Sequence, residues 1–85
     1  MQIVATEQAV ADLAALRAAL PDQDAVAASR LGIQLMAALD RLEYQAPRGR
    51  PGAIAGTREL VEVWPYTIVY RITPDAVQIL RIYHP

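Results

Sequence analysis

The sequence predicts an α+β fold in which an N-terminal strand and a helical hairpin precede a three-stranded antiparallel meander. The first observation is three segments rich in Val, Ile, Leu, Thr and Tyr, at Thr57–Val63, Tyr66–Ile72 and Ala76–Tyr83. These residue types suit a pleated strand. The second observation is their spacing, because the short turns between these segments join antiparallel neighbours. The third is the helical periodicity of the upstream residues, which have to cover this sheet.

The length and composition of the chain set the first limits on its function. The 85 residues make a single domain, spanning residues 1–85. Hydrophobic residues are 54% of the chain, which suggests that some apolar surface is kept for a partner. The net charge of −1 provides no basic field, so we expect no sequence-specific DNA binding by this chain alone. With no cysteine, signal peptide or long apolar run, we expect a soluble, cytoplasmic protein without membrane contact.

A strand and a first helix are predicted at the N-terminus. Gln2–Ala5 is a short apolar segment that we expect to join the sheet, and Thr6 is a good N-cap for the helix that follows. The helix is expected over Glu7–Leu20, and Pro21 ends it. Its expected apolar stripe consists of Val10, Leu13, Leu16 and Leu20.

A second, longer helix is predicted to reach Tyr44, with Asp22 or Asp24 as its N-cap. Its leucines share one helical face, and they are Leu31, Leu35, Leu39 and Leu42, with Met36 beside them. Gly32 costs about 1 kcal/mol relative to Ala inside a helix, so we expect it where two helices cross closely. The stripe is too short for a coiled coil and indicates core packing, with the two helices forming an antiparallel hairpin.

The segment between the second helix and the meander, Gln45–Ala53, is predicted to be a loop. It contains two prolines, two glycines, Arg48 and Arg50. It lacks the Lys-Ser/Thr ending of a phosphate-binding P-loop. The two arginines form either a solvated basic loop or a site for phosphate or acidic side chains. They are our candidates for contact with a cellular target.

The last predicted strand is apolar on both faces. One face would carry Val77, Ile79, Arg81 and Tyr83, and the other Gln78, Leu80, Ile82 and His84. Two helices can cover only one face of so small a sheet, and strands that are apolar on both faces are typically buried on both. We therefore expect the uncovered face to be an apolar docking surface, which indicates a protein that works with a partner.

Several segments together resemble the RelE/ParE superfamily of bacterial toxins, the toxin halves of type II toxin–antitoxin pairs. The most specific are Gly49-Arg50, Gly56–Leu60, Pro65–Ile72 and Ile79–His84, and the sequence looks closer to ParE than to RelE. The resemblance implies a small α+β toxin bound by a cognate ParD-like antitoxin in a hetero-oligomer, with no cofactor and no metal site. ParE-like members are associated with inhibition of DNA gyrase, and RelE-like members cleave mRNA on the ribosome.

Two departures from the RelE pattern favour binding over bond cleavage. RelE-like toxins carry an arginine in the central strand, where this sequence has Thr67, and basic and tyrosine residues after the final strand, where it stops at Pro85. ParE-like toxins also usually continue past the final histidine. We therefore expect a ParE-like toxin that binds its target and is not an enzyme. Two alternatives stay open: a ribosome-dependent mRNA endonuclease, and a degenerate toxin that only binds its antitoxin.

The candidate site residues lie in and around the predicted meander. RNA cleavage needs a cation and groups that transfer protons, and the weak candidates for these roles are Arg81, Tyr83 and His84. The candidates for antitoxin binding are Arg58, Arg71, Leu80, Arg81 and Ile82. Two of these arginines could instead form surface ion pairs with nearby glutamates, Glu59 and Glu62.

Overall fold

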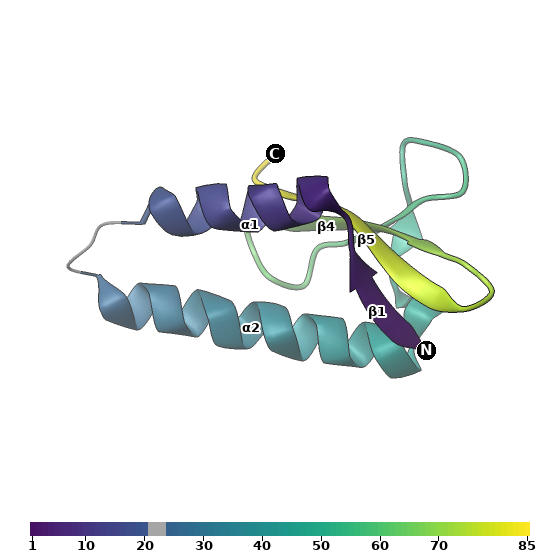
Figure 1. The fold of residues 1–85 in the computed structure, drawn as a ribbon, viewed down its shortest axis with the longest axis horizontal. Coiled ribbons are helices and arrows are strands. Elements are labelled where there is room, and N and C mark those ends of the chain that lie inside the picture. The colour runs from purple at the N-terminus through teal and green to yellow at the C-terminus, as the bar shows by residue number, and fades with distance from the viewer. Residues whose placement is uncertain (21–23) are drawn as a thin grey trace.

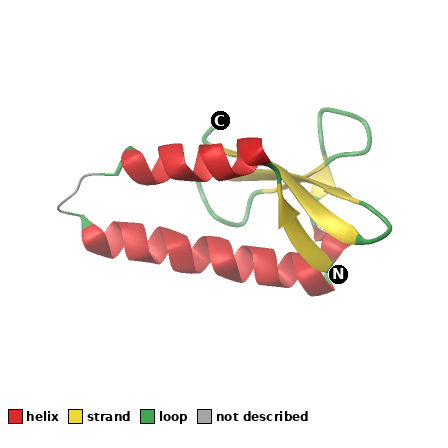
Figure 2. Ribbon diagram, in the orientation of Figure 1, coloured by secondary structure: helices red, strands yellow, loops and turns green. Residues whose placement is uncertain are grey.

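One mixed five-stranded sheet and two α-helices make up the fold, which the computed structural model describes for residues 1–20 and 24–85. The elements are β1 (Gln2–Ala5), α1 (Glu7–Ala18), α2 (Ala25–Tyr44), a short 3-10 helix (Ala46–Arg48), β2 (Arg50–Pro51), β3 (Arg58–Leu60), β4 (Thr67–Ile72) and β5 (Ala76–Tyr83). The strand order is β1-β5-β4-β3-β2, with β1 parallel to β5 and the other pairs antiparallel. The predicted α+β class, N-terminal strand and meander are confirmed (Figure 2).

The two helices run side by side in opposite directions, as the predicted hairpin requires (Figure 1). Their connected ends extend beyond the sheet, which gives the molecule its long dimension of 41 Å against 23 and 21 Å for the others. One face of the sheet and the inner faces of the helices share a single core, in which Leu42, Ile68, Tyr70, Val77 and Ile79 are the largest fully buried side chains. None of the helices in the described part of the chain covers the opposite face of the sheet.

The start of α1 follows the prediction, but its buried face does not. The Thr6 hydroxyl accepts a hydrogen bond from the Ala9 amide at 3.2 Å, as an N-cap should. The Thr6 amide donates to the Ile79 carbonyl of β5, which fixes how the helix leaves the sheet. As a result the small Ala9 faces the core and Val10, predicted to be in the apolar stripe, is exposed. The helix ends at Ala18, two residues before the predicted end.

The leucine stripe of α2 is confirmed. Leu31, Leu35 and Leu42 are buried, and Leu39 packs against them. Asp24 caps the helix by accepting from the Ala27 amide, while Pro21 and Asp22 lie outside the described residues. The other two expectations are wrong: Met36 is exposed, and apart from the nearby backbone of α2 no described atom lies within 4 Å of where a Cβ on Gly32 would be, so neither described helix crosses another there. None of the described helices is both long and apolar enough to cross a bilayer.

The middle of the chain differs most from the predicted meander. Residues 50–51, expected in a loop, form β2 and pair with Arg58 and Glu59 of β3. In turn β3 is only three residues long, Arg58–Leu60, instead of the seven predicted. The chain leaves the sheet after Leu60 because it must reach the Trp64-Pro65 turn, where the Tyr66 amide donates to the Val63 carbonyl. Val63 is nevertheless buried in the core.

A β-bulge in β5 corrects the predicted alternation of its side chains. Tyr70 pairs with Ile79 but the preceding residue, Val69, pairs with Arg81, so one extra residue, Leu80, lies in β5. Ile79 and Ile82 therefore both face the core. The face opposite the core, which we call the outer sheet face, includes Glu59, Val69, Arg71, Gln78, Leu80 and Arg81, together with Val4, Arg50, Thr67 and Tyr83, which the strand register places on the same face. It is a mixed surface with three arginines, and not the apolar surface that strict alternation predicted.

Candidate functional site

The end of β5 is joined to α1 by a carboxylate–guanidinium pair. Arg81 Nε donates to Asp12 Oδ2 at 2.7 Å and Arg81 Nη2 to Oδ1 at 3.3 Å. Asp12 Oδ2 also accepts from the Ile82 amide at 3.0 Å. Since β1 ends at Ala5, opposite Ile79, none of the described strands lies beside this edge of β5 beyond that point. Asp12 therefore accepts the hydrogen bond from the Ile82 amide that a neighbouring strand would otherwise accept, and it also binds Arg81.

The environment of Asp12 favours its charged form. The hydrogen bond from Arg81 is the largest cause, and with the Ile82 amide it lowers the pKa of Asp12 from 3.8 to about 2 against the opposing effect of desolvation. The carboxylate is only 10% exposed, whereas the Arg81 side chain is 50% exposed. Arg81 therefore has an internal partner and still presents part of its guanidinium to the solvent.

The three weak catalytic candidates are not brought together as one reacting group. The guanidinium of Arg81 lies 5.8 Å from the centre of the Tyr83 ring, which is a cation–π contact. His84 instead meets Tyr66 edge to face, with ring centres 5.9 Å apart, and its Nδ1 lies 2.8 Å from the Pro85 carbonyl. Within the described residues, no hydrogen bond joins His84 to Arg81 or Tyr83. To transfer a proton, two of these groups would have to form a hydrogen bond with each other or with a bound substrate.

The predicted antitoxin-binding residues separate into surface and interior positions. Arg71 is exposed on the outer sheet face and donates to Gln78 at 2.9 Å. Leu80 is half-buried in the bulge. Ile82 is in the core, so its side chain cannot meet a partner. Arg58 donates to the backbone carbonyls of residues 47 and 49, so it stabilises the preceding loop instead of pairing with a glutamate.

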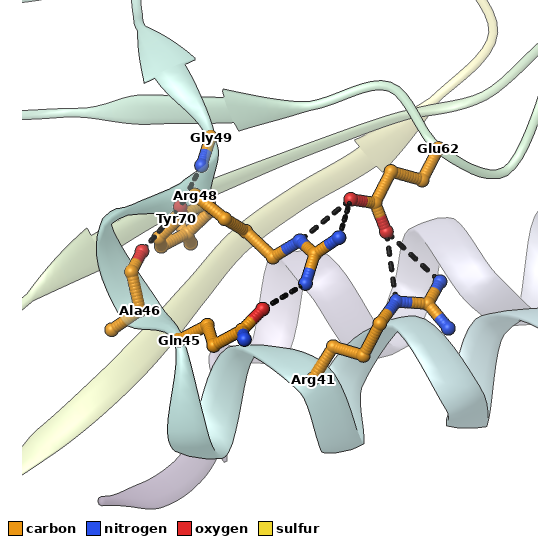
Figure 3. A network of polar contacts seen from close by, with 7 residues as sticks. All are labelled: Arg41, Gln45, Ala46, Arg48, Gly49, Glu62 and Tyr70. Atoms are coloured by element: carbon orange, nitrogen blue, oxygen red, sulfur yellow. Dashed lines mark hydrogen bonds and ion pairs between the residues drawn. The ribbon is translucent and has the colours of Figure 1, made fainter.

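The loop arginines are each held by a carboxylate, and one of these contacts belongs to a larger network (Figure 3). Arg48 binds Glu62 Oε1 at 2.6 Å, while Arg41 binds Glu62 Oε2 at 2.9 Å. Gln45 accepts a further hydrogen bond from Arg48. Two cations thus share one anion, and α2 itself adds the carboxylates of Asp40 and Glu43 at this end. Arg50 pairs separately with Glu59 at 3.1 Å, and its side chain is well exposed.

A buried tyrosine of the sheet fixes the position of the loop that contains Arg48. Tyr70 Oη donates to the Ala46 carbonyl at 2.5 Å and accepts from the Gly49 amide at 2.9 Å (Figure 3). A Cβ on Gly49 would lie 2.6 Å from that hydroxyl and 2.9 Å from the Glu59 carbonyl, so the close approach requires glycine. Tyr70, in the central strand, therefore attaches to the sheet the 3-10 helix that contains Arg48.

Three of these residues were not predicted as site residues from the sequence, namely Asp12, Arg41 and Tyr70, and Glu62 was considered only as an ion-pair partner of Arg58 or Arg71. A buried tyrosine normally hydrogen-bonds through its hydroxyl, so the position of Tyr70 on the apolar face of a strand was a usable signal. The sequence gave no signal for which arginine each carboxylate would meet, because the partners are 14 to 69 residues apart in the chain. Among the described residues no three His, Asp or Glu side chains are placed to hold a metal ion.

Comparisons with known proteins agree on one family. Residues 3–85 match the family model described as the ParE toxin of the type II toxin–antitoxin system parDE. The chain is 42% identical to "Toxin RelE2" of Caulobacter vibrioides over 83 residues, covering 98% of this chain and 93% of that protein. It is 40% identical over 80 residues to "Putative toxin Y4kP" of Sinorhizobium fredii, covering 93% of this chain and 82% of that one. A solved structure titled "Chromosomal ParDE TA system from P. aeruginosa" matches with a TM-score of 0.78 and 28% identity, over 99% of this chain and 95% of the other.

Proposed function

This chain belongs to the ParE toxin family of type II toxin–antitoxin systems, and we propose that it acts by binding its cellular target without cleaving a bond. By resemblance to ParE toxins, the target is DNA gyrase. The exposed Arg50, together with Arg41 and Arg48, supplies the cations for contact with an acidic surface.

The observation that carries this proposal is the environment of Thr67. RelE-like toxins resemble this chain but have an arginine at this point of the central strand. Here the side chain is a threonine that is only 4% exposed, opposite Tyr83 in the neighbouring strand. A buried hydroxyl cannot supply the positive charge that stabilises a phosphate in an RNA-cleaving site. With Arg81 directed to Asp12, the remaining groups support binding better than catalysis.

The proposal is tested by an enzymatic assay of gyrase in the presence of the purified toxin. We expect the toxin to inhibit supercoiling of a relaxed plasmid, and Arg50→Ala to weaken inhibition by about fivefold, the effect of about 1 kcal/mol from a partly exposed charge. Arg17→Ala, an exposed arginine on α1, is the matched control and should leave inhibition unchanged. Gyrase that supercoils normally with excess folded toxin would exclude this target.

The endonuclease alternative has one observation in its favour, the name RelE2 carried by a relative that is 42% identical. Primer extension on a message in a translating extract separates the two functions. We expect no toxin-dependent cuts. Cuts that vanish in His84→Ala or Arg81→Ala, with the variant still folded, would replace binding by cleavage as the activity.

We further propose that a ParD-like antitoxin covers the outer sheet face. No helix of residues 1–20 and 24–85 covers this face, which presents Arg71, Leu80 and Arg81 between polar neighbours. Arginine pairs tightly with carboxylates through two parallel hydrogen bonds. A partner segment that is apolar opposite the bulge and acidic beside it would therefore fit this surface.

Antitoxin binding is tested by calorimetric titration of a cognate ParD-like antitoxin into the purified toxin. Arg71→Glu is expected to weaken the complex by at least about tenfold, because it replaces an attraction by a like-charge contact. Arg17→Glu makes the same change of charge on α1, away from the outer sheet face, and should leave the affinity within about twofold. Equal affinity for both variants would place the antitoxin elsewhere.

A further inference from the structure

The surface of α2 opposite its leucine stripe is apolar and uncovered. Four large side chains there are between 60% and 84% exposed: Val26, Ile33, Met36 and Tyr44. Together with Arg30, Ala37 and Asp40, which lie beside or between them, they form what we call the outer stripe of α2. Shallow grooves run along this stripe and are lined by its residues together with their neighbours in the chain. An exposed apolar band of this kind normally marks an interaction surface.

The order of residues along the outer stripe is that of a helix that packs against another helix. Val26, Ile33 and Asp40 are spaced by seven residues, which returns them to nearly the same side after two turns. Met36 and Ala37 follow Ile33 by one turn, on either side of this line. The spacing therefore fits a partner that is itself an α-helix.

We propose that this partner is a second copy of the chain, packed antiparallel through α2 about a two-fold axis at the level of Leu35. The stripe is self-complementary about that level. Val26 and Tyr44 lie nine residues on either side of it, so each would meet the other across the axis. Ile33 and Ala37 lie two residues on either side, which places a large side chain opposite a small one at the centre.

The charged residues of the stripe favour antiparallel over parallel packing of the two helices. Arg30 and Asp40 lie five residues on either side of the same level, so Arg30 of each copy would meet Asp40 of the other. In residues 1–20 and 24–85, neither has an ion-pair partner within its own chain. Parallel helices would bring like charges together, which is unfavourable. Antiparallel helices provide each carboxylate in the apolar band with the cation that it needs when water is removed.

The size of the surface indicates a reversible dimer. At 20 residues α2 is about 30 Å long, and one pair of such helices gives an interface at the low end of the sizes seen for specific complexes. Dimerisation through α2 leaves the outer sheet face free. It therefore goes beyond the proposed function and is compatible with two antitoxins bound to one toxin dimer.

Sedimentation equilibrium of the purified chain over a range of concentrations tests the proposal. We expect the mass to rise from monomer to dimer with concentration, and Ile33→Glu to raise the dissociation constant by at least about tenfold, since a carboxylate would be buried at the centre of the contact. Ile54→Glu is the matched control, because Ile54 is 72% exposed in a loop and Ile33 is 70% exposed. It should dimerise like the wild type.

A charge exchange tests the antiparallel arrangement itself. Arg30→Asp and Asp40→Arg should each weaken the dimer by about tenfold, because each places like charges in contact twice per dimer. The double variant Arg30→Asp/Asp40→Arg restores opposite charges and should return to within about threefold of the wild type. Circular dichroism verifies that each variant is folded.

Three results would overturn the proposal: a wild-type mass that stays monomeric at all concentrations, an Ile33→Glu dimer as strong as that of Ile54→Glu, or a double variant no stronger than the single ones. Antitoxin titration separates this surface from the proposed antitoxin site. If Ile33→Glu, and not Arg71→Glu, loses the antitoxin while the chain alone is monomeric, the stripe binds the antitoxin and the homodimer is rejected.

Discussion

Tyr70→Phe is expected to lower the free energy of unfolding by about 2–3 kcal/mol, because it leaves two buried backbone groups without a partner. Among residues 1–20 and 24–85, the lost hydroxyl is the only group that joins the Ala46 carbonyl and the Gly49 amide to the sheet. Phenylalanine fills the same space, so the loss reports the hydrogen bonds and not a cavity. Urea denaturation followed by circular dichroism measures it, with the change taken from the midpoint at constant slope.

Tyr66→Phe is the control for this change. Tyr66 also packs against the core, but within the described residues its hydroxyl makes no hydrogen bond to a side chain or to the backbone. Removing it should change the free energy of unfolding by less than about 0.5 kcal/mol. If the two variants were equally stable, the loop that carries Arg48 would not depend on Tyr70 for its position.

The helices and the main strands could be predicted because local signals and burial agree there. The leucines of α2 recur on one face, and that face is the one that packs on the sheet. Thr6 caps α1 because its side chain and its position in the sequence both favour an N-terminus. In such segments the pattern and the packing give the same answer.

The errors occur where long-range contacts override the local pattern. Val10 fits the apolar periodicity of α1, yet the hydrogen bond from Thr6 to β5 rotates the helix so that the smaller Ala9 is buried. The bulge at Leu80 shifts the later residues of β5 by one position. Nothing in an apolar run marks an extra residue, and every assignment of faces beyond it is reversed.

The candidate site was predicted in its residue types but not in its contacts. Arginines at the loop and in β5 were recognised as the chain's charged binding groups, yet each of Arg48, Arg50 and Arg81 has a carboxylate partner within the chain. Which carboxylate it is depends on the register of strands and on the path of loops. These are set by the whole fold and not by neighbours in the sequence.

Asp12→Ala is expected to lower the free energy of unfolding by about 1–3 kcal/mol, because the Ile82 amide at the edge of β5 loses its acceptor. Arg81→Ala should cost less, since the arginine is half exposed and water can replace part of its contact. A double-mutant cycle between the two positions isolates the energy of the pair. A free energy of unfolding in Asp12→Ala equal to that of the wild type would mean that α1 does not hold the end of β5.

Asp12→Asn separates the hydrogen bond from the charge, because an amide oxygen can still accept from the Ile82 amide. We expect it to keep part of the stability of the wild type near pH 7. The pKa of Asp12 is lowered in the folded protein, from 3.8 to about 2, so the contribution of its charge is complete above pH 4 and is lost as the pH falls through 2. The difference between wild type and Asp12→Asn should therefore shrink over this interval, as urea titrations at several pH values would measure. A difference that stayed constant down to pH 2 would show that the ion pair with Arg81 adds nothing to the hydrogen bond, and that Asp12 acts only as the missing strand partner of β5.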